Sequence, residues 1–195
     1  EVDPSGVARL DFAGRVPAGR ITLRFDYTTG FREGAEGLFR AKVGDGWYAW
    51  TQMEPLDARR MFPGFDEPGF KVPFTVSVAA PAALKAFANT PEVAAETRDG
   101  WTTHHFASSK PLPTYLVSVG IGDFDVRETV IPANAVRKVP LAFRVIATKG
   151  QAARMDTTLA EVPKIVGILE DYFGIAYPYE KLDFIASPVM GGAME

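Results

Sequence analysis

The alternation of apolar and polar residues across the first two-thirds of the chain limits its fold most strongly. In RITLRFDY, Ile21, Leu23, Phe25 and Tyr27 occupy every second position. A period of two places such side chains on one face of a β-strand. Further runs of this kind, separated by Pro, Asn and Gly, are residues 37–43, 47–53, 72–78, 93–97, 101–107, 114–126 and 141–147. They predict a mostly β fold, an antiparallel sandwich or curved sheet. Asp45-Gly46 between two of the runs predicts a hairpin.

The pattern changes near Lys149. Over residues 151–173 the apolar positions recur at helical spacing, at Leu159, Val162, Ile165/Val166, Leu169 and Tyr172/Phe173. Gly174 predicts the helix C-cap, and Pro163 predicts a kink or a late helix start. KLDFIAS (residues 181–187) is typical of another strand. A helix after an all-β run predicts two domains, residues 1–144 and residues 145–195.

Composition narrows the function classes. The chain has 195 residues, no cysteine, and 21 Lys+Arg against 24 Asp+Glu, a net charge of −3. Without cysteine there is no disulfide, no Cys-ligated zinc and no thiol nucleophile. Without a basic run, nucleic acid and anionic membranes are poor partners. No apolar run is long enough for a membrane span, and the compartment stays open between the cytoplasm and an exported or periplasmic form.

Several charged clusters have a structural interpretation. His104 and His105 are adjacent on an expected strand, so they point to opposite faces and do not readily share a metal. Asp123 and Asp125 share a face, which suits paired acid and base chemistry, but solvated carboxylates at a strand end are the simpler interpretation. The glycines of residues 30–37 lack the spacing of a phosphate-binding loop. The residues alone therefore predict no complete active site.

The run TQMEPLDARRMFPGFDEPGF, residues 51–70, combines six charged groups with three prolines and several aromatics. Its charges allow two interpretations. They form either a site or a knot of ion pairs in which arginine forks meet carboxylates and hold a proline-rich loop. We favour the ion-pair knot because buried charges are normally paired.

The same run resembles the signature T-Q-x-E-x-x-D-A-R-x-x-F-P-C-x-D-E-P of zinc aminopeptidases of the aminopeptidase N family. Four more segments resemble motifs of that family in the same order: ANTP, KPLPTYLVSVGIGDF, YFGIAYPYEKLDFIASP and GGAME, the last similar to the exopeptidase motif G-A-M-E-N without its Asn. Gly64 stands where the family usually has Cys, which changes packing and not chemistry.

The resemblance implies roles for particular residues. In the family, the Glu of T-Q-x-E and the Glu of G-A-M-E-N hold the free α-amino group of a peptide, and these positions are Glu54 and Glu195. Gln52 lines the same pocket. The family's G-A-M positions, Gly192, Ala193 and Met194, contact substrate backbone and the first side-chain pocket by the same resemblance. Gly191 and Gly192 carry no side chains that would block a peptide adding as a strand.

The resemblance also implies what this sequence does not contain. The H-E-x-x-H zinc motif and the later Glu ligand follow G-A-M-E-N in the family, so zinc belongs to the parent enzyme and no catalytic or metal residue is expected here. We expect an excised and inactive fragment. Its residues 1–144 are the β-rich, saddle-like N-terminal domain, without its first strands, and residues 145–195 open the thermolysin-like α/β catalytic domain. The implied partners are peptides with free N-termini and the remainder of the catalytic domain.

Two alternatives remain open. A non-catalytic relative would keep the β-rich domain as a scaffold or peptide-binding module. The leukotriene-epoxide hydrolase branch typically has Gln at the position of Glu54, which counts against it. The preferred N-terminal residue and the oligomeric state are not predicted.

Overall fold

The computed structural model describes residues 6–195, and it confirms a mostly β chain with antiparallel sheets and one helix near its C-terminal end. The strands within these residues are β1 (Gly37–Val43), β2 (Gly46–Gln52), β3 (Ser77–Pro81), β4 (Lys85–Ala88), β5 (Glu92–Arg98), β6 (Trp101–Phe106), β7 (Val119–Gly122), β8 (Phe124–Ile131), β9 (Leu141–Thr148) and β10 (Lys181–Ile185). The helix is α1 (Asp156–Phe173), preceded by the 3₁₀ turn η3 (Ala152–Met155).

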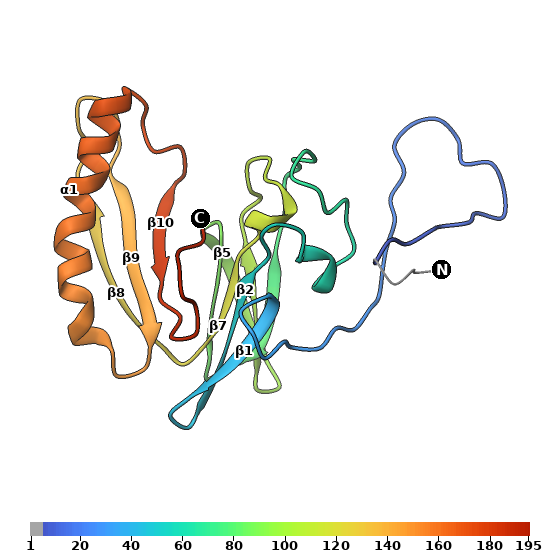
Figure 1. The fold of residues 1–195 in the computed structure, drawn as a ribbon, viewed down its shortest axis with the longest axis horizontal. Coiled ribbons are helices and arrows are strands. Elements are labelled where there is room, and N and C mark those ends of the chain that lie inside the picture. The colour runs from blue at the N-terminus through green and yellow to red at the C-terminus, as the bar shows by residue number, and fades with distance from the viewer. Residues whose placement is uncertain (1–5) are drawn as a thin grey trace.

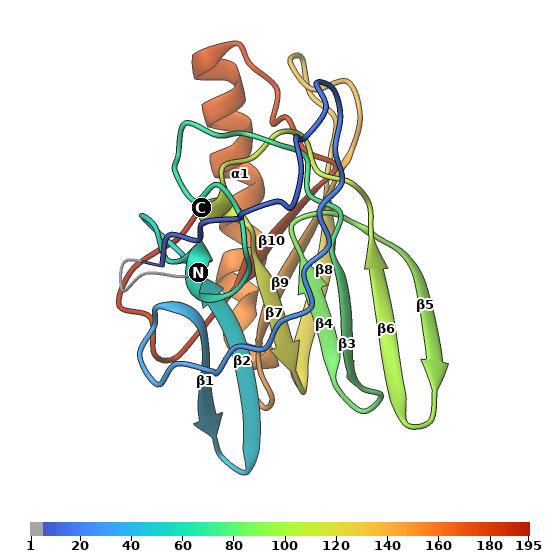
Figure 2. The ribbon, with the colours of Figure 1, turned by 90° about the vertical axis from the view of Figure 1, so that its right-hand side faces the viewer.

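The strands form three small sheets, in the orders β1-β2-β7-β4, β10-β9-β8 and β3-β6-β5. All pairs are antiparallel except β10 with β9, which run parallel. A parallel pair needs a crossover connection, and α1 provides it between β9 and β10. Figure 1 shows α1 on the outer side of β8, β9 and β10, away from β1 and β2. Figure 2 shows β5 and β6 at the right-hand edge of the molecule, on the side away from β1.

Strand β9 lies in the middle layer and is buried on both faces. One face contributes Leu141, Phe143 and Val145 to a core with α1. The other face contributes Ile146 to a second core, with Phe39, Tyr48, Trp50 and Phe87 of the four-stranded sheet and Phe124 of β8. Burial on both faces accounts for the nearly continuous apolar sequence of this strand.

Helix α1 packs its Leu159, Val162 and Val166 on the middle sheet, which confirms part of the predicted helical stripe. It begins at Asp156, upstream of Pro163, and continues through this proline. The expectation of a late start at Pro163 is therefore wrong. Gly174 adopts φ 65°, and its N–H donates to the Glu170 carbonyl, as expected for a left-handed C-cap.

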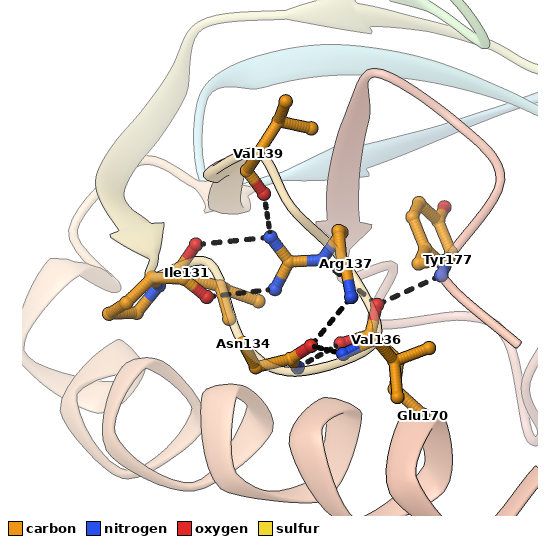
Figure 3. Close-up of polar contacts among 8 residues, drawn as sticks. Ile131, Asn134, Val136, Arg137, Val139, Glu170 and Tyr177 are labelled. Carbon is orange, nitrogen blue, oxygen red and sulfur yellow. Dashed lines mark hydrogen bonds and ion pairs between the residues drawn. The ribbon is translucent and has the colours of Figure 1, made fainter. Parts of the chain in front are cut away.

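A buried ion pair holds the end of α1 against the loop between β8 and β9 (Figure 3). Arg137 Nε donates to Glu170 Oε1 over 2.9 Å, and both residues are 3% exposed. The amide of Asn134 and the backbone N–H of Tyr177 also donate to the Glu170 carboxylate, at 2.6 and 2.8 Å. Burial pushes the pKa of Glu170 upward, but these hydrogen bonds outweigh it and leave the pKa below its ordinary value.

The predicted strand at residues 20–27 is wrong. Residues 20–27 form no strand, and their four alternating apolar side chains are between 46% and 53% exposed. Figure 1 shows this part of the chain as a coil beside the sheets. The physical reason is the lack of a partner, because none of the backbone hydrogen bonds of the described residues links 20–27 to another strand.

Two further predictions concern the run 72–78 and the position of the domain division. The run 72–78 becomes a strand only from Ser77, with Val72 bridged to Leu112. The division predicted between residues 144 and 145 falls inside β9, which pairs with β8 on one side and β10 on the other.

Candidate functional site

Gln52 and Glu54 lie where β2 ends. Trp50 and Gln52 share one face of the strand, and Thr51 and Met53 point to the other side. Thr51 Oγ1 accepts from the Val119 N–H at 2.9 Å, and Met53 is fully buried. The end of the strand is therefore fixed by its neighbours, while Gln52 is half-buried and Glu54 is exposed.

The other predicted site residues follow β10. Gly191, Gly192, Ala193 and Glu195 are exposed, and Met194 is half-buried. Residues 191–195 form neither helix nor strand, so the strand expected to align substrate is not formed by these residues alone. Figure 1 shows the segment after β10 turning into the space on the side of the four-stranded sheet, where the C-terminus lies.

One apolar core connects the two groups of predicted residues. Met190, directly before Gly191, packs against the cluster that contains Trp50, two positions before Gln52. Ile185 of β10 packs on the same cluster, and its side chain lies 3.7 Å from the point where a Cβ on Gly120, the partner of Trp50 in β7, would stand. The structure thus positions both segments from a common core. Within residues 6–195, no hydrogen bond joins Gln52 or Glu54 to the segment 191–195.

Sequence reasoning missed a buried charged cluster that holds β10 in place. Asp183 accepts a bidentate pair of hydrogen bonds from Arg144, at 2.8 and 2.6 Å, and it lies 2.5 Å from Lys181 Nζ. Lys181 also donates to the carbonyl of Ala88 in β4, at 2.7 Å. Lys181 and Asp183 are two apart on one strand, so opposite charges at i and i+2 are the signal that identifies such a pair.

Burial and pairing act in opposite directions on this cluster. Burial lowers the pKa of Lys181, and the nearby Asp183 carboxylate opposes that shift. For Asp183, burial raises the pKa, but the hydrogen bond from Arg144 and the charge of Lys181 outweigh it, so the pKa is lowered. The pKa of Lys181 is therefore lowered overall, and the contacts of the cluster tie β10 to β9 and β4.

Four of the six charges of residues 51–70 form the expected ion pairs, and Glu54 and Glu67 do not take part. Asp66 accepts from the backbone N–H and Nε of Arg59, each at 2.9 Å, and from Thr114 Oγ1 at 2.6 Å. Arg60 pairs with Asp57 at 2.7 Å. The Asp66 side chain is 4% exposed, so its charge is held inside the loop. Asp57, Arg59, Arg60 and Asp66 therefore have a structural role in this loop.

Other motif residues and candidates also have structural partners. Asn89 of ANTP donates to the Leu116 carbonyl and accepts from the Ser118 N–H, both at 2.8 Å. His104 contacts Glu92, whereas His105 contacts Ser77. Asp125 accepts from the first backbone N–H groups of η3, so it acts as a cap and not as the solvated carboxylate expected.

Glu54 and Glu195 differ from these residues. Within residues 6–195, neither carboxylate takes part in a hydrogen bond or an ion pair, and both are exposed. An unpaired carboxylate at the surface costs little, so exposure alone assigns no role. Asp57, Arg59, Arg60 and Asp66 of the loop after β2 are paired within the fold, whereas Glu54 and Glu195, like the exposed Glu67 and Glu180, remain available to a ligand.

The described residues do not form a metal site. No three His, Cys, Asp or Glu side chains among residues 6–195 lie close enough together to hold a metal ion. A cavity of about 330 Å³ lies between residues 136–141 and 176–180, and the predicted site residues do not line it. In the same described range, α1 lacks the apolar character needed to cross a membrane, and no other helix has the length.

Comparison with known proteins identifies the family. Residues 7–116 match the family model described as Peptidase M1 N-terminal domain. The chain is 36% identical over 192 residues to Aminopeptidase M1-C of Oryza sativa subsp. japonica, covering 95% of this chain and 21% of that protein. It is 36% identical over 149 residues to Glutamyl aminopeptidase of Bos taurus, covering 75% of this chain and 15% of the relative.

A bacterial relative is similar over the whole chain. Aminopeptidase N of Acetobacter pasteurianus is 32% identical over 202 residues, covering 99% of this chain and 55% of that protein. The chain spans about a fifth of the length of the rice relative. More than half of the chain lies within the family match, so this protein belongs to the Peptidase M1 N-terminal domain family.

Proposed function

We propose that this chain is the amine-recognition part of a longer zinc-dependent aminopeptidase, which removes single residues from the N-termini of peptides. The carrying observation is that Glu54 and Glu195, two exposed carboxylates without partners among the described residues, follow segments that pack on one core through Trp50 and Met190. The relatives with similar sequences are named as aminopeptidases, which supports the reaction class.

The chemistry of the two carboxylates fits a peptide's free amine. An ammonium group between Glu54 and Glu195 forms charge-assisted hydrogen bonds, worth about 1.5–3 kcal/mol each. A blocked peptide brings no cation and leaves two crowded carboxylates without a partner. A polar site of this kind rejects a substrate that lacks the matching group much more strongly than an apolar pocket rejects a missing methylene.

The remaining site residues position the peptide. In this proposal Gln52 lines the amine pocket, and Gly191 and Gly192 leave room for the peptide backbone to approach. Ala193 and Met194 contact the backbone and the first side-chain pocket. We place the zinc ligands in the rest of the parent protein, because the zinc motif follows G-A-M-E-N in the family that this sequence resembles.

The division into domains is part of the same proposal. Residues 1–144 form the β-rich N-terminal domain, and residues 145–195 open the catalytic domain. Strand β9 crosses this division and pairs with strands from both parts. A rigid connection of this kind suits a site whose two carboxylates come from different domains, because it limits their relative motion.

The test compares peptides with free and acetylated N-termini. The full-length parent protein should hydrolyse the free peptide and leave the acetylated one intact, and the 195-residue chain alone should hydrolyse neither. Equal cleavage of both peptides by the parent protein would contradict amine recognition. Binding of the free peptide without hydrolysis would instead identify the non-catalytic, peptide-binding relative.

A further inference from the structure

Helix α1 carries a second apolar stripe that faces away from the middle sheet. Ile165, Ile168, Leu169 and Tyr172 occupy positions i, i+3, i+4 and i+7, which share one side of a helix. They are 50%, 66%, 49% and 81% exposed, in that order. The stripe is distinct from the inner face of Leu159, Val162 and Val166, which packs on the middle sheet.

The stripe continues past the end of the helix. Phe173 and Ile175 are 63% and 69% exposed, and the rings of Tyr172 and Phe173 meet edge to face at 5.0 Å. Contiguous apolar surface of this kind is rare on a complete soluble monomer and marks a surface that another structure covers. A helix surface that is apolar on two sides is typical of a helix packed between two layers.

The composition of the stripe favours a permanent partner. Its four side chains carry no charge, and the charged Glu161, Lys164 and Asp171 lie outside it, with Glu161 and Lys164 paired at 2.7 Å. Permanent interfaces are more apolar than transient ones. The 95% match of this chain accounts for only 21% of its rice relative, so in such a protein most of the polypeptide lies elsewhere.

We propose that the α1 stripe, Ile165, Ile168, Leu169 and Tyr172, is the docking surface for the polypeptide that follows residue 195 in the parent protein. This inference rests on the proposed function in one respect, that the parent protein is longer than this chain. The occupant is an apolar face of that same polypeptide, and it completes a layer outside α1. The contact fixes the middle sheet, and with it β10, relative to the remainder of the protein.

The test uses the full-length protein with a photoreactive benzophenone amino acid in place of Tyr172. Irradiation followed by peptide mass spectrometry should give cross-links within one molecule, from position 172 to peptides beyond residue 195. The control places the same group at Ala160, which is exposed on a different side of α1. The yield of such cross-links at position 160 should be several-fold lower.

Three outcomes would overturn the inference: cross-links between two copies, equal yields at both positions, or a natural chain that ends at residue 195. A second variant, Ile168→Glu, should lower the melting temperature of the full-length protein by several degrees, whereas Ala160→Glu should leave it unchanged. Peptidase activity is measured separately on the unmodified protein. Cross-links without activity would support the docking surface and contradict the proposed function.

Discussion

At the scale of single residues, Gly122 shows how a motif position is fixed by packing. A Cβ built on Gly122 would lie 2.2 Å from Tyr48 Cδ1. Tyr48 has no room to move, because its ring stacks on Trp50 and its hydroxyl bonds the Asp123 carbonyl and the Lys149 N–H, at 3.0 and 3.1 Å. The glycine is therefore required by the tyrosine that covers it.

Gly122→Ala should therefore lower the free energy of unfolding by about 1–3 kcal/mol, the usual cost of overpacking a core. The matched control is Gly167→Ala in α1, where a new Cβ meets nothing within 4 Å. That change should raise the stability by up to about 1 kcal/mol, because alanine favours a helix. Urea denaturation of both variants measures these changes in the free energy of unfolding. An unchanged midpoint for Gly122→Ala would contradict the prediction and show that Tyr48 can move aside.

The buried carboxylate of Glu170 predicts a pH dependence. Because its pKa in the folded protein lies below the ordinary value of 4.5, Glu170 contributes stability at pH values above 4.5. That contribution is lost as the pH falls through the lowered pKa. Glu170→Gln leaves the Arg137 charge without its buried partner, and should cost about 3–5 kcal/mol at pH 7.

The difference between wild type and Glu170→Gln should shrink as the pH falls below 4.5, since protonation removes the same charge from the wild type. Denaturation curves at pH 7 and at several acidic pH values measure it. A difference that stays constant with pH would mean that the charge of Glu170 does not stabilise the fold.

At the scale of elements, Asp66 is the buried carboxylate that holds the loop after β2. Asp66→Asn removes the charge that pairs with Arg59 and accepts from Thr114. Because the side chain of Arg59 is 30% exposed, we expect a loss of about 2 kcal/mol, within the range for hydrogen bonds to charged groups. The adjacent Glu67→Gln, at an exposed position, should change stability by less than about 0.5 kcal/mol. Similar effects in a denaturation experiment would argue against the structural role of Asp66.

The sequence predicted those elements whose signals are local. The Asp45-Gly46 hairpin, β9, and the end of α1 at Gly174 each depend on a short pattern, and each is confirmed. Residues 20–27 carry an equally clear alternation but form no strand. Alternation indicates which face of a strand is apolar, and it does not supply the neighbour whose backbone completes the hydrogen bonds.

The candidate site was predictable only in part, because a local pattern does not show which distant strands come together. The motif resemblance identified Glu54 and Glu195 as amine-binding candidates, and this assignment remains a proposal. The Lys181–Asp183–Arg144 cluster was missed because it joins β10 and β9, whose parallel pairing depends on a crossover of more than thirty residues. Contacts across such distances follow from the fold and not from local spacing.

At the scale of the whole molecule, three hydrophobic clusters of the described residues hold the helix and the sheets together, and two of them lie on either face of the middle sheet. Helix α1 packs on the middle sheet, and the other face of that sheet packs on the sheet that contains β2. Both candidate carboxylates follow segments that pack on the second core. Glu54 and Glu195 are far apart in the sequence, but both follow segments anchored on this core. Their relative position therefore depends on the packing of Trp50, Ile185 and Met190.

The measurement that tests the central claim most directly is the kinetics of Glu54→Gln and Glu195→Gln in the full-length protein. Each change should lower kcat/KM for a free N-terminal peptide by roughly 10- to 150-fold, the equivalent of losing one charge-assisted hydrogen bond. Glu96→Gln, on the exposed strand β5, serves as the control and should match the wild type. If Glu54→Gln and Glu195→Gln retain wild-type kcat/KM, the two carboxylates do not bind the amine and the account is wrong.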